Sequence, residues 1–164
     1  MTGGSTVTLE GDGTSTGNTG VGSQPSGQGE LHVSGNGSSF DAGGILGIGY
    51  DIDTASAGGT GEVTVRDDGE IVADDVRLAT ADSELEIGTT GQLTVNNDYI
   101  MTAGRLSLDI GGSTPGNFAA FTAANQADID GGTIALSFVD GYLPTAGQSF
   151  QFFTATNGLS LIHI

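Results

Sequence analysis

The sequence predicts an all-β protein whose short strands stack in parallel as a β-solenoid, that is, a single-stranded parallel β-helix. Three observations predict this fold class: a high glycine content, short alternating aliphatic segments, and a five-residue pattern that recurs in one orientation. Of 164 residues, 30 are glycine, 3 are proline and none is cysteine. Leu, Ile, Val and Thr occur in short pieces separated by Gly, Asn and Asp, which is typical of many strands joined by tight turns.

The recurring pattern is glycine, polar, aliphatic, polar, aliphatic. Its alternation at period two places the aliphatic pair on one face of a strand and the polar pair on the other. The first three copies begin 32 and 30 residues apart, which indicates a unit of about thirty residues. The copies are residues 29–33, 61–65, 91–95, 104–108 and 132–136, with shorter alternations at 45–48, 76–78 and 85–87.

Strands of three to five residues are too short to be stable alone. If each unit forms one coil and the next coil lies about 4.8 Å away, equivalent strands pair in parallel and equivalent side chains stack inward. A fixed period of 20–50 residues is the sequence signature of such solenoids. An antiparallel sandwich is disfavoured because the unit recurs in the same orientation at nearly constant spacing.

Three regions differ in composition. Residues 1–28 are rich in Gly, Ser and Thr, as in a linker, but the alternation at residues 6–10 predicts a strand, and hence a thin first coil or an assembly strand. Residues 29–110 carry the repeats. Residues 111–164 hold seven of the ten aromatic residues, which predicts an aromatic-rich C-terminal end of β-helix coils with a cap-like end, because an open solenoid end exposes core and unpaired backbone.

Twenty acidic residues face three arginines and no lysine, so the net charge is -17. Nucleic acid is excluded as a partner because phosphate binding requires basic surface, and an anionic membrane surface is excluded in the same way. The acid is expected to keep a sheet-rich protein soluble and to oppose unwanted edge pairing. No apolar run approaches the roughly 18 residues of a membrane span, so membrane insertion is not expected. Disulfide and thiol chemistry are excluded because the chain has no cysteine.

Three acidic pairs have the spacing that places both carboxylates on one strand face: Asp51 and Asp53, Glu84 and Glu86, and Asp128 and Asp130. Glycosidases use two carboxylates about 5–9.5 Å apart, but a pair that flanks an inward aliphatic residue, as Glu84 and Glu86 flank Leu85, faces solvent. No lysine is present to neutralise an acidic sugar. The sequence therefore predicts no catalytic, cofactor-binding or metal-binding residues.

Calcium is the one cofactor that the pattern allows, and none is required. Asp67, Asp68 and Asp98 are expected at equivalent corners one repeat apart, where their oxygens could stack around the ion, although ordinary aspartate turns are the favoured interpretation. His32 and His163 are isolated from other ligands, and His32 is expected on an outward strand face.

The repeat residues resemble a known family. Residues 29–38, 46–49 and 59–69 are similar to the autotransporter/PEP-CTERM-associated repeat, with Asp68 in place of one glycine. Residues 106–116, 131–136 and 141–150 are similar to a recurrent autotransporter passenger segment. The resemblance covers about four-fifths of the chain. It implies a right-handed β-helix on a bacterial cell surface or outside the cell, without fixed catalytic residues. Two features of the autotransporter pattern are not seen, a membrane β-barrel and a C-terminal sorting signal.

These observations predict a non-enzymatic extracellular structural protein, a subunit of a surface fibre or matrix. Its two chemically unlike ends would pair head to tail with further copies of itself, because heterologous contacts that do not close give open filaments. The alternative is an adhesin-type passenger domain that binds a host or glycan ligand. That alternative would be favoured by a long insertion between coils or an exposed aromatic platform, and the sequence indicates neither. A polysaccharide-active enzyme fragment is a remote third interpretation.

Overall fold

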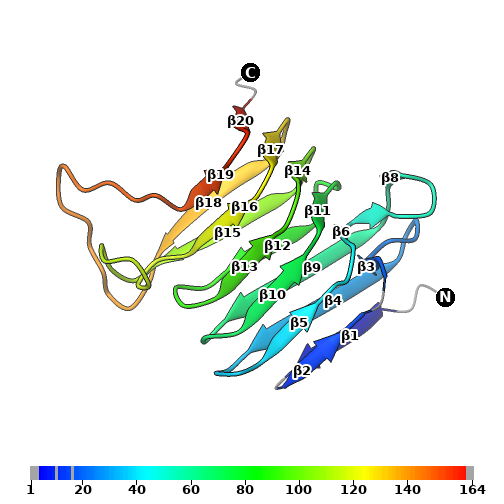
Figure 1. Ribbon diagram of the computed structural model, residues 1–164, viewed down its shortest axis with the longest axis horizontal. Helices are drawn as coiled ribbons and strands as arrows, with labels where there is room; N and C mark the ends of the chain where they lie inside the picture. The colour runs from blue at the N-terminus through cyan, green and yellow to red at the C-terminus, as the bar shows by residue number, and fades with distance from the viewer. Residues whose placement is uncertain (1–3, 10, 16, 162–164) are drawn as a thin grey trace.

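The computed structural model describes residues 4–9, 11–15 and 17–161, and these residues form 20 strands and no helix (Figure 1). Eighteen strands form three six-stranded parallel sheets. In each sheet the strands follow one another in chain order, so each coil contributes one strand to every sheet. The predicted all-β solenoid of stacked parallel strands is confirmed. Within the described residues, no helix is long and apolar enough to cross a membrane.

The strands of the three sheets run as follows. Sheet A contains β1 (Gly4–Leu9), β4 (Gln28–Ser34), β9 (Thr60–Arg66), β12 (Glu84–Ile87), β15 (Arg105–Ile110) and β18 (Thr133–Phe138). Sheet B contains β2 (Asp12–Thr14), β5 (Ser39–Asp41), β10 (Glu70–Ala73), β13 (Gln92–Val95), β16 (Ala120–Ala123) and β19 (Phe153–Ala155). Sheet C contains β3 (Thr19–Val21), β6 (Ile45–Ile48), β11 (Asp75–Leu78), β14 (Tyr99–Met101), β17 (Gln126–Ile129) and β20 (Gly158–Leu161). A short antiparallel pair, β7 (Tyr50–Asp51) and β8 (Ser56–Ala57), lies between β6 and β9.

The core consists of columns of aliphatic side chains, because in-register parallel pairing places like positions above one another. In sheet A one column runs through Leu31, Val63, Leu85 and Leu106, each at most 3% exposed. The residues that alternate with these along each strand point outward, as the sequence pattern predicts.

Aromatic rings fill the core toward the C-terminal coils. The ring of Phe121 lies 5.1 Å from that of Tyr99 and 4.5 Å from that of Phe153, measured between centroids. Tyr99 is completely buried, and its hydroxyl donates only to Met101 Sδ, at 3.7 Å. Burial therefore raises the pKa of Tyr99 far above its ordinary value.

The thirty-residue unit is wrong, because the third copy of the pattern belongs to another sheet. Gly29 and Gly61 pair in sheet A, but residues 92–95 form β13 of sheet B. The sheet A strand of that coil is β12, and Glu62, Glu84 and Arg105 pair in succession, only 22 and 21 residues apart. All three sheets use the same alternating pattern, so the pattern alone does not identify the sheet.

The longer coils contain insertions at corners. The coil from Gln28 to Thr60 spans 32 residues and contains the β7–β8 hairpin. The coil from Arg105 to Thr133 spans 28 residues and contains an extended segment between β15 and β16. A further segment, residues 139–152, extends away from the sheets between β18 and β19 (Figure 1).

Candidate functional site

The three acidic pairs lie on different parts of the surface and do not come together. Asp51 is in the β7–β8 hairpin, Glu84 and Glu86 are on the outer face of sheet A, and Asp128 is on the outer face of sheet C. Asp51 Oδ1 accepts hydrogen bonds from the backbone N–H of Asp53 (3.0 Å) and of Thr54 (3.3 Å). Hydrogen bonding from Thr54 lowers the pKa of Asp51, so this carboxylate holds a turn and is poorly suited to donate a proton.

The pair on sheet A faces outward as expected, with Leu85 and Ile87 fully buried beneath it. Arg105 Nε lies 3.4 Å from Glu84 Oε1, and the Ser107 hydroxyl donates to the same oxygen. Partial burial and the nearby charge of Asp109 raise the pKa of Glu86. Partial burial and Asp140 likewise raise the pKa of Asp109. The outer face of sheet A thus carries a row of half-buried carboxylates with too few cations to neutralise them. The effect of these carboxylates is mutual electrostatic repulsion.

The substitution Glu86→Gln tests this electrostatic description. A raised pKa means that the folded protein holds the proton more tightly than the unfolded chain, so the ionised carboxylate costs stability above the folded pKa. The cost disappears as the pH falls below the ordinary value of 4.5. We expect E86Q to raise the free energy of unfolding at pH 7 and to have little effect at pH about 3.5. Urea unfolding of both proteins at matched salt measures this difference, and an equal effect at the two pH values would contradict it.

The aspartates considered for calcium do not share a corner. Asp67 and Asp68 form the turn between sheets A and B, with φ of 54° and 64°, whereas Asp98 precedes β14 at the corner between sheets B and C. The expectation of equivalent corners was based on the thirty-residue unit and is wrong for the same reason. In the part of the chain that the structure describes, no three or more His, Cys, Asp or Glu side chains are grouped so that they could hold a metal ion.

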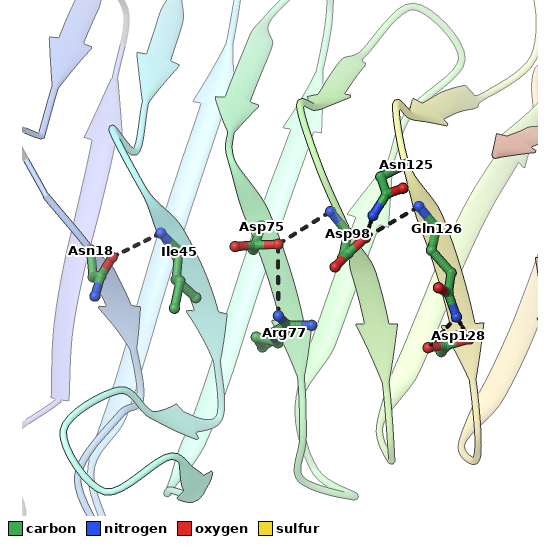
Figure 2. Close-up of polar contacts among 8 residues, drawn as sticks. All are labelled: Asn18, Ile45, Asp75, Arg77, Asp98, Asn125, Gln126 and Asp128. Atoms are coloured by element: carbon green, nitrogen blue, oxygen red, sulfur yellow. Dashed lines mark hydrogen bonds and ion pairs between the residues drawn. The ribbon is translucent and has the colours of Figure 1, made fainter. Parts of the chain in front are cut away.

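The corner between sheets B and C carries a ladder of amide and carboxylate side chains, drawn in part in Figure 2. Asn125 Nδ2 donates to Asp98 Oδ1 at 2.6 Å, and Asn157 Nδ2 donates to Asn125 Oδ1 at 2.8 Å. Asp75, the first residue of β11, accepts the backbone N–H of Asp98 at 3.2 Å, and Asp98, which directly precedes β14, accepts that of Gln126 at 3.2 Å. The ladder links successive coils through groups that would otherwise be unpaired at a turn.

Sequence reasoning missed this ladder, although a signal exists. An Asn or Asp recurs directly after each of the strands β10, β13, β16 and β19, or one residue later. It becomes visible only once these strands are assigned to one sheet. The ladder satisfies its own polar groups and is a structural element.

The histidines do not form a site. His32 lies on the outer face of sheet A, as predicted, and its Nε2 is 3.6 Å from Glu30 Oε2. His163 lies outside the described residues.

The β7–β8 hairpin is an insertion between coils of the kind that the sequence did not indicate. It folds onto the outer face of sheet C, where Gly20 and Gly47 leave room. A Cβ added at Gly47 would lie 3.2 Å from an Ile52 side-chain atom, and one at Gly20 would lie 3.4 Å from another. The sequence showed the glycines but could not show that a neighbouring loop uses the space.

The N-terminal end of the solenoid is open and hollow. Strands β1, β2 and β3 each have a neighbour on one side only among the described residues. A cavity of about 570 Å³ lies at this end, lined by residues of the first two coils and of the corner between β3 and β4, among them the inward Val7, Val21, Leu31 and Phe40. Val7 occupies a core column but is 48% exposed.

The C-terminal end is open as well, and apolar side chains protrude from it. Strands β18, β19 and β20 are the last of their sheets. Leu136, Phe138 and Leu159 continue the core columns of Leu108, Ile110 and Ala127. They are 44%, 49% and 49% exposed, whereas the residues beneath them are fully buried. The predicted cap is therefore not closed over the last coil in the described part of the chain.

Few charged residues lie at either end of the solenoid. Seventeen of the 20 acidic residues and all three arginines lie within residues 28–130. The other three acidic residues are Glu10 and Asp12, which precede this range, and Asp140, which follows it. The molecule thus has acidic sides and nearly uncharged ends, a distribution that opposes lateral contact and permits end-to-end contact. No protein-family model, curated protein or solved structure matches the chain, so the autotransporter resemblance stays a prediction from the residues quoted for it.

Proposed function

We propose that this protein is a non-enzymatic structural subunit that assembles head to tail into fibres outside the cell or at a bacterial cell surface. One observation carries the proposal: among the described residues, three strand edges are open at each end of the solenoid, and each of the three sheets is parallel. An unpaired strand edge is a template for another strand. Because the two ends differ, each contact leaves one free end of each kind, and the assembly can continue.

The exposed apolar side chains support the same conclusion. Leu136, Phe138 and Leu159 occupy positions that are core in the coil beneath. Burial of such side chains against another coil contributes roughly 1.5–3 kcal/mol each. The acidic sides oppose lateral bundling, so growth along the axis is favoured over amorphous aggregation.

Concentration-dependent assembly tests the proposal. We expect the purified protein to form species that lengthen with concentration, seen by analytical ultracentrifugation and as thin filaments in negative-stain micrographs. The substitution Leu159→Asp places a charge at the end of a core column and is expected to reduce association at least about tenfold, equivalent to about 1.4 kcal/mol.

The matched control is Thr94→Asp, which adds the same charge at an exposed position on the outer face of β13, far from either end. We expect this variant to assemble like the wild type, with both variants retaining the circular dichroism of strands. A wild-type protein that stays monomeric at millimolar concentration would refute the proposal.

An adhesin-type binding module is the second candidate, and two insertions favour it. The β7–β8 hairpin and residues 139–152 both depart from the coil outline (Figure 1), and Leu143 in the second segment is 82% exposed. Binding to a glycan array that disappears when residues 139–152 are replaced by a short Gly/Ser turn would promote this candidate. Binding that survives the replacement would remove its structural basis.

A further inference from the structure

Two of the core columns differ in residue size between the two ends of the solenoid. In sheet B one inward column begins at Gly13 and ends at Phe153, passing through Phe40, Ile71, Leu93 and Phe121. In sheet C a second column begins at Thr19 and ends at Leu159, passing through Leu46, Val76, Tyr99 and Ala127. Each column therefore starts with a small residue and finishes with a large one.

Of these two small residues, Thr19 borders the cavity of about 570 Å³ at the N-terminal end. The buried Oγ1 of Thr19 has no hydrogen-bond partner. Protein interiors are close-packed, and a void forfeits contacts on all its walls. The first coil alone does not fill its own interior, whereas the last coil carries apolar side chains that extend beyond the fold.

We propose that the occupant of the N-terminal cavity is the last coil of a second copy of this chain, docked in one register. Extending the columns places Ile134 of one copy opposite Val7 of the next, Phe153 opposite Gly13, and Leu159 opposite Thr19. The inference deepens the proposed self-association by specifying its geometry, and it rests on that proposed function.

The register follows from the columns themselves. Val7, Leu31, Val63, Leu85, Leu106 and Ile134 form one column of sheet A. A shift by one residue would turn every inward side chain of the joint outward, and a shift by two would place Leu159 opposite Val21 instead of Thr19. In the proposed register Phe153 meets Gly13, and Leu159 meets Thr19 at the cavity.

A second copy fits better than another kind of partner because three edges must be satisfied together. A single extended peptide could pair with one strand and would leave the other two sheets open. The end of another solenoid with three parallel sheets presents three edges with the matching direction and spacing. The nearly uncharged ends permit this contact between two molecules of the same strong negative charge.

Engineered cysteines test the register, since the chain has none of its own. Thr8 and Ala135 occupy one outward column of sheet A, through His32, Thr64, Glu86 and Ser107. In the proposed joint their Cα atoms lie one strand spacing apart, about 4.8 Å, which a disulfide can bridge. Within one molecule they are five spacings apart, about 24 Å, so an internal bond cannot form.

We expect the double variant Thr8→Cys with Ala135→Cys to give a ladder of oligomers on mild oxidation, seen by non-reducing electrophoresis. The control pairs Thr8→Cys with Ser137→Cys, two residues further along β18, where the Cα atoms would be about 8 Å apart and beyond disulfide reach. Single-cysteine variants are expected to stop at dimers.

The outcomes separate this inference from the proposed function. A ladder with the first pair alone supports the register. Assembly in the centrifuge without a ladder for the first pair, or with an equal ladder for the control, overturns the register and leaves self-association standing. Absence of assembly for both the wild type and the variants overturns the proposed function and the register with it.

Discussion

The substitution Leu85→Ala is expected to lower the free energy of unfolding by about 2–5 kcal/mol. Leu85 is completely buried in the middle of the solenoid, with Val63 in the coil on one side and Leu106 in the coil on the other. Its truncation removes contacts to both neighbours at once. The backbone of β12 is hydrogen-bonded to β9 and β15 on its two sides, so these strands have little freedom to collapse into the space. Urea unfolding followed by circular dichroism measures the change.

The same substitution at Leu143 is the matched control, because this side chain is 82% exposed. We expect Leu143→Ala to change the free energy of unfolding by less than about 0.5 kcal/mol. If the two substitutions had equal effects, Leu85 would not lie in a packed column, and the stacking of β9, β12 and β15 would be in doubt.

The substitution Gly22→Ala is expected to lower the free energy of unfolding by more than about 2 kcal/mol. Gly22 forms the corner between β3 and β4 with φ of +65°, which L-residues other than Asn and Asp adopt at a cost of about 1–2 kcal/mol. An added Cβ would also overlap the carbonyl of Thr60 in the next coil. Backbone cannot rotate away as a side chain can, so the two coils must separate locally.

Gly116→Ala separates these two causes. Gly116 also has a positive φ, +92°, but an added Cβ would meet no heavy atom within 4 Å. We expect this control to show the backbone strain alone, about 1–2 kcal/mol. Thermal or urea unfolding of both variants measures the difference, and a loss at Gly22 no larger than that at Gly116 would show that the corner backbones are not in close contact.

The fold class followed from the sequence because its signal is local. The alternation at residues 29–33 and 61–65 predicted strands with Leu31, Val33, Val63 and Val65 inward, and the structure buries all four. The strand expected near residues 6–10 is present as β1, which ends at Leu9, while residue 10 lies outside the described residues. Periodicity of this kind depends only on the chain and its pleat.

The length of each coil and the grouping of residues at its corners could not be predicted from the sequence, because both depend on which strands are stacked on one another. Residues 91–95 have the same sequence pattern as residues 61–65, yet their strands, β13 and β9, lie in different sheets. The grouping of Asp67 with Asp98 failed for this reason. The ladder through Asp98, Asn125 and Asn157 was missed for the same reason, since its members are neighbours only after coils of unequal length are stacked.

The direction of the sheet hydrogen bonds has a mechanical consequence. They run along the solenoid axis, so a tensile load between the two ends pulls each coil directly away from the next. Such a load opens bonds a few at a time and does not shear a whole strand at once. Each released coil of 21–32 residues would yield roughly 70–110 Å of extended chain. A fibre of the kind proposed above would therefore lengthen stepwise under load, coil by coil, and would absorb energy before it breaks.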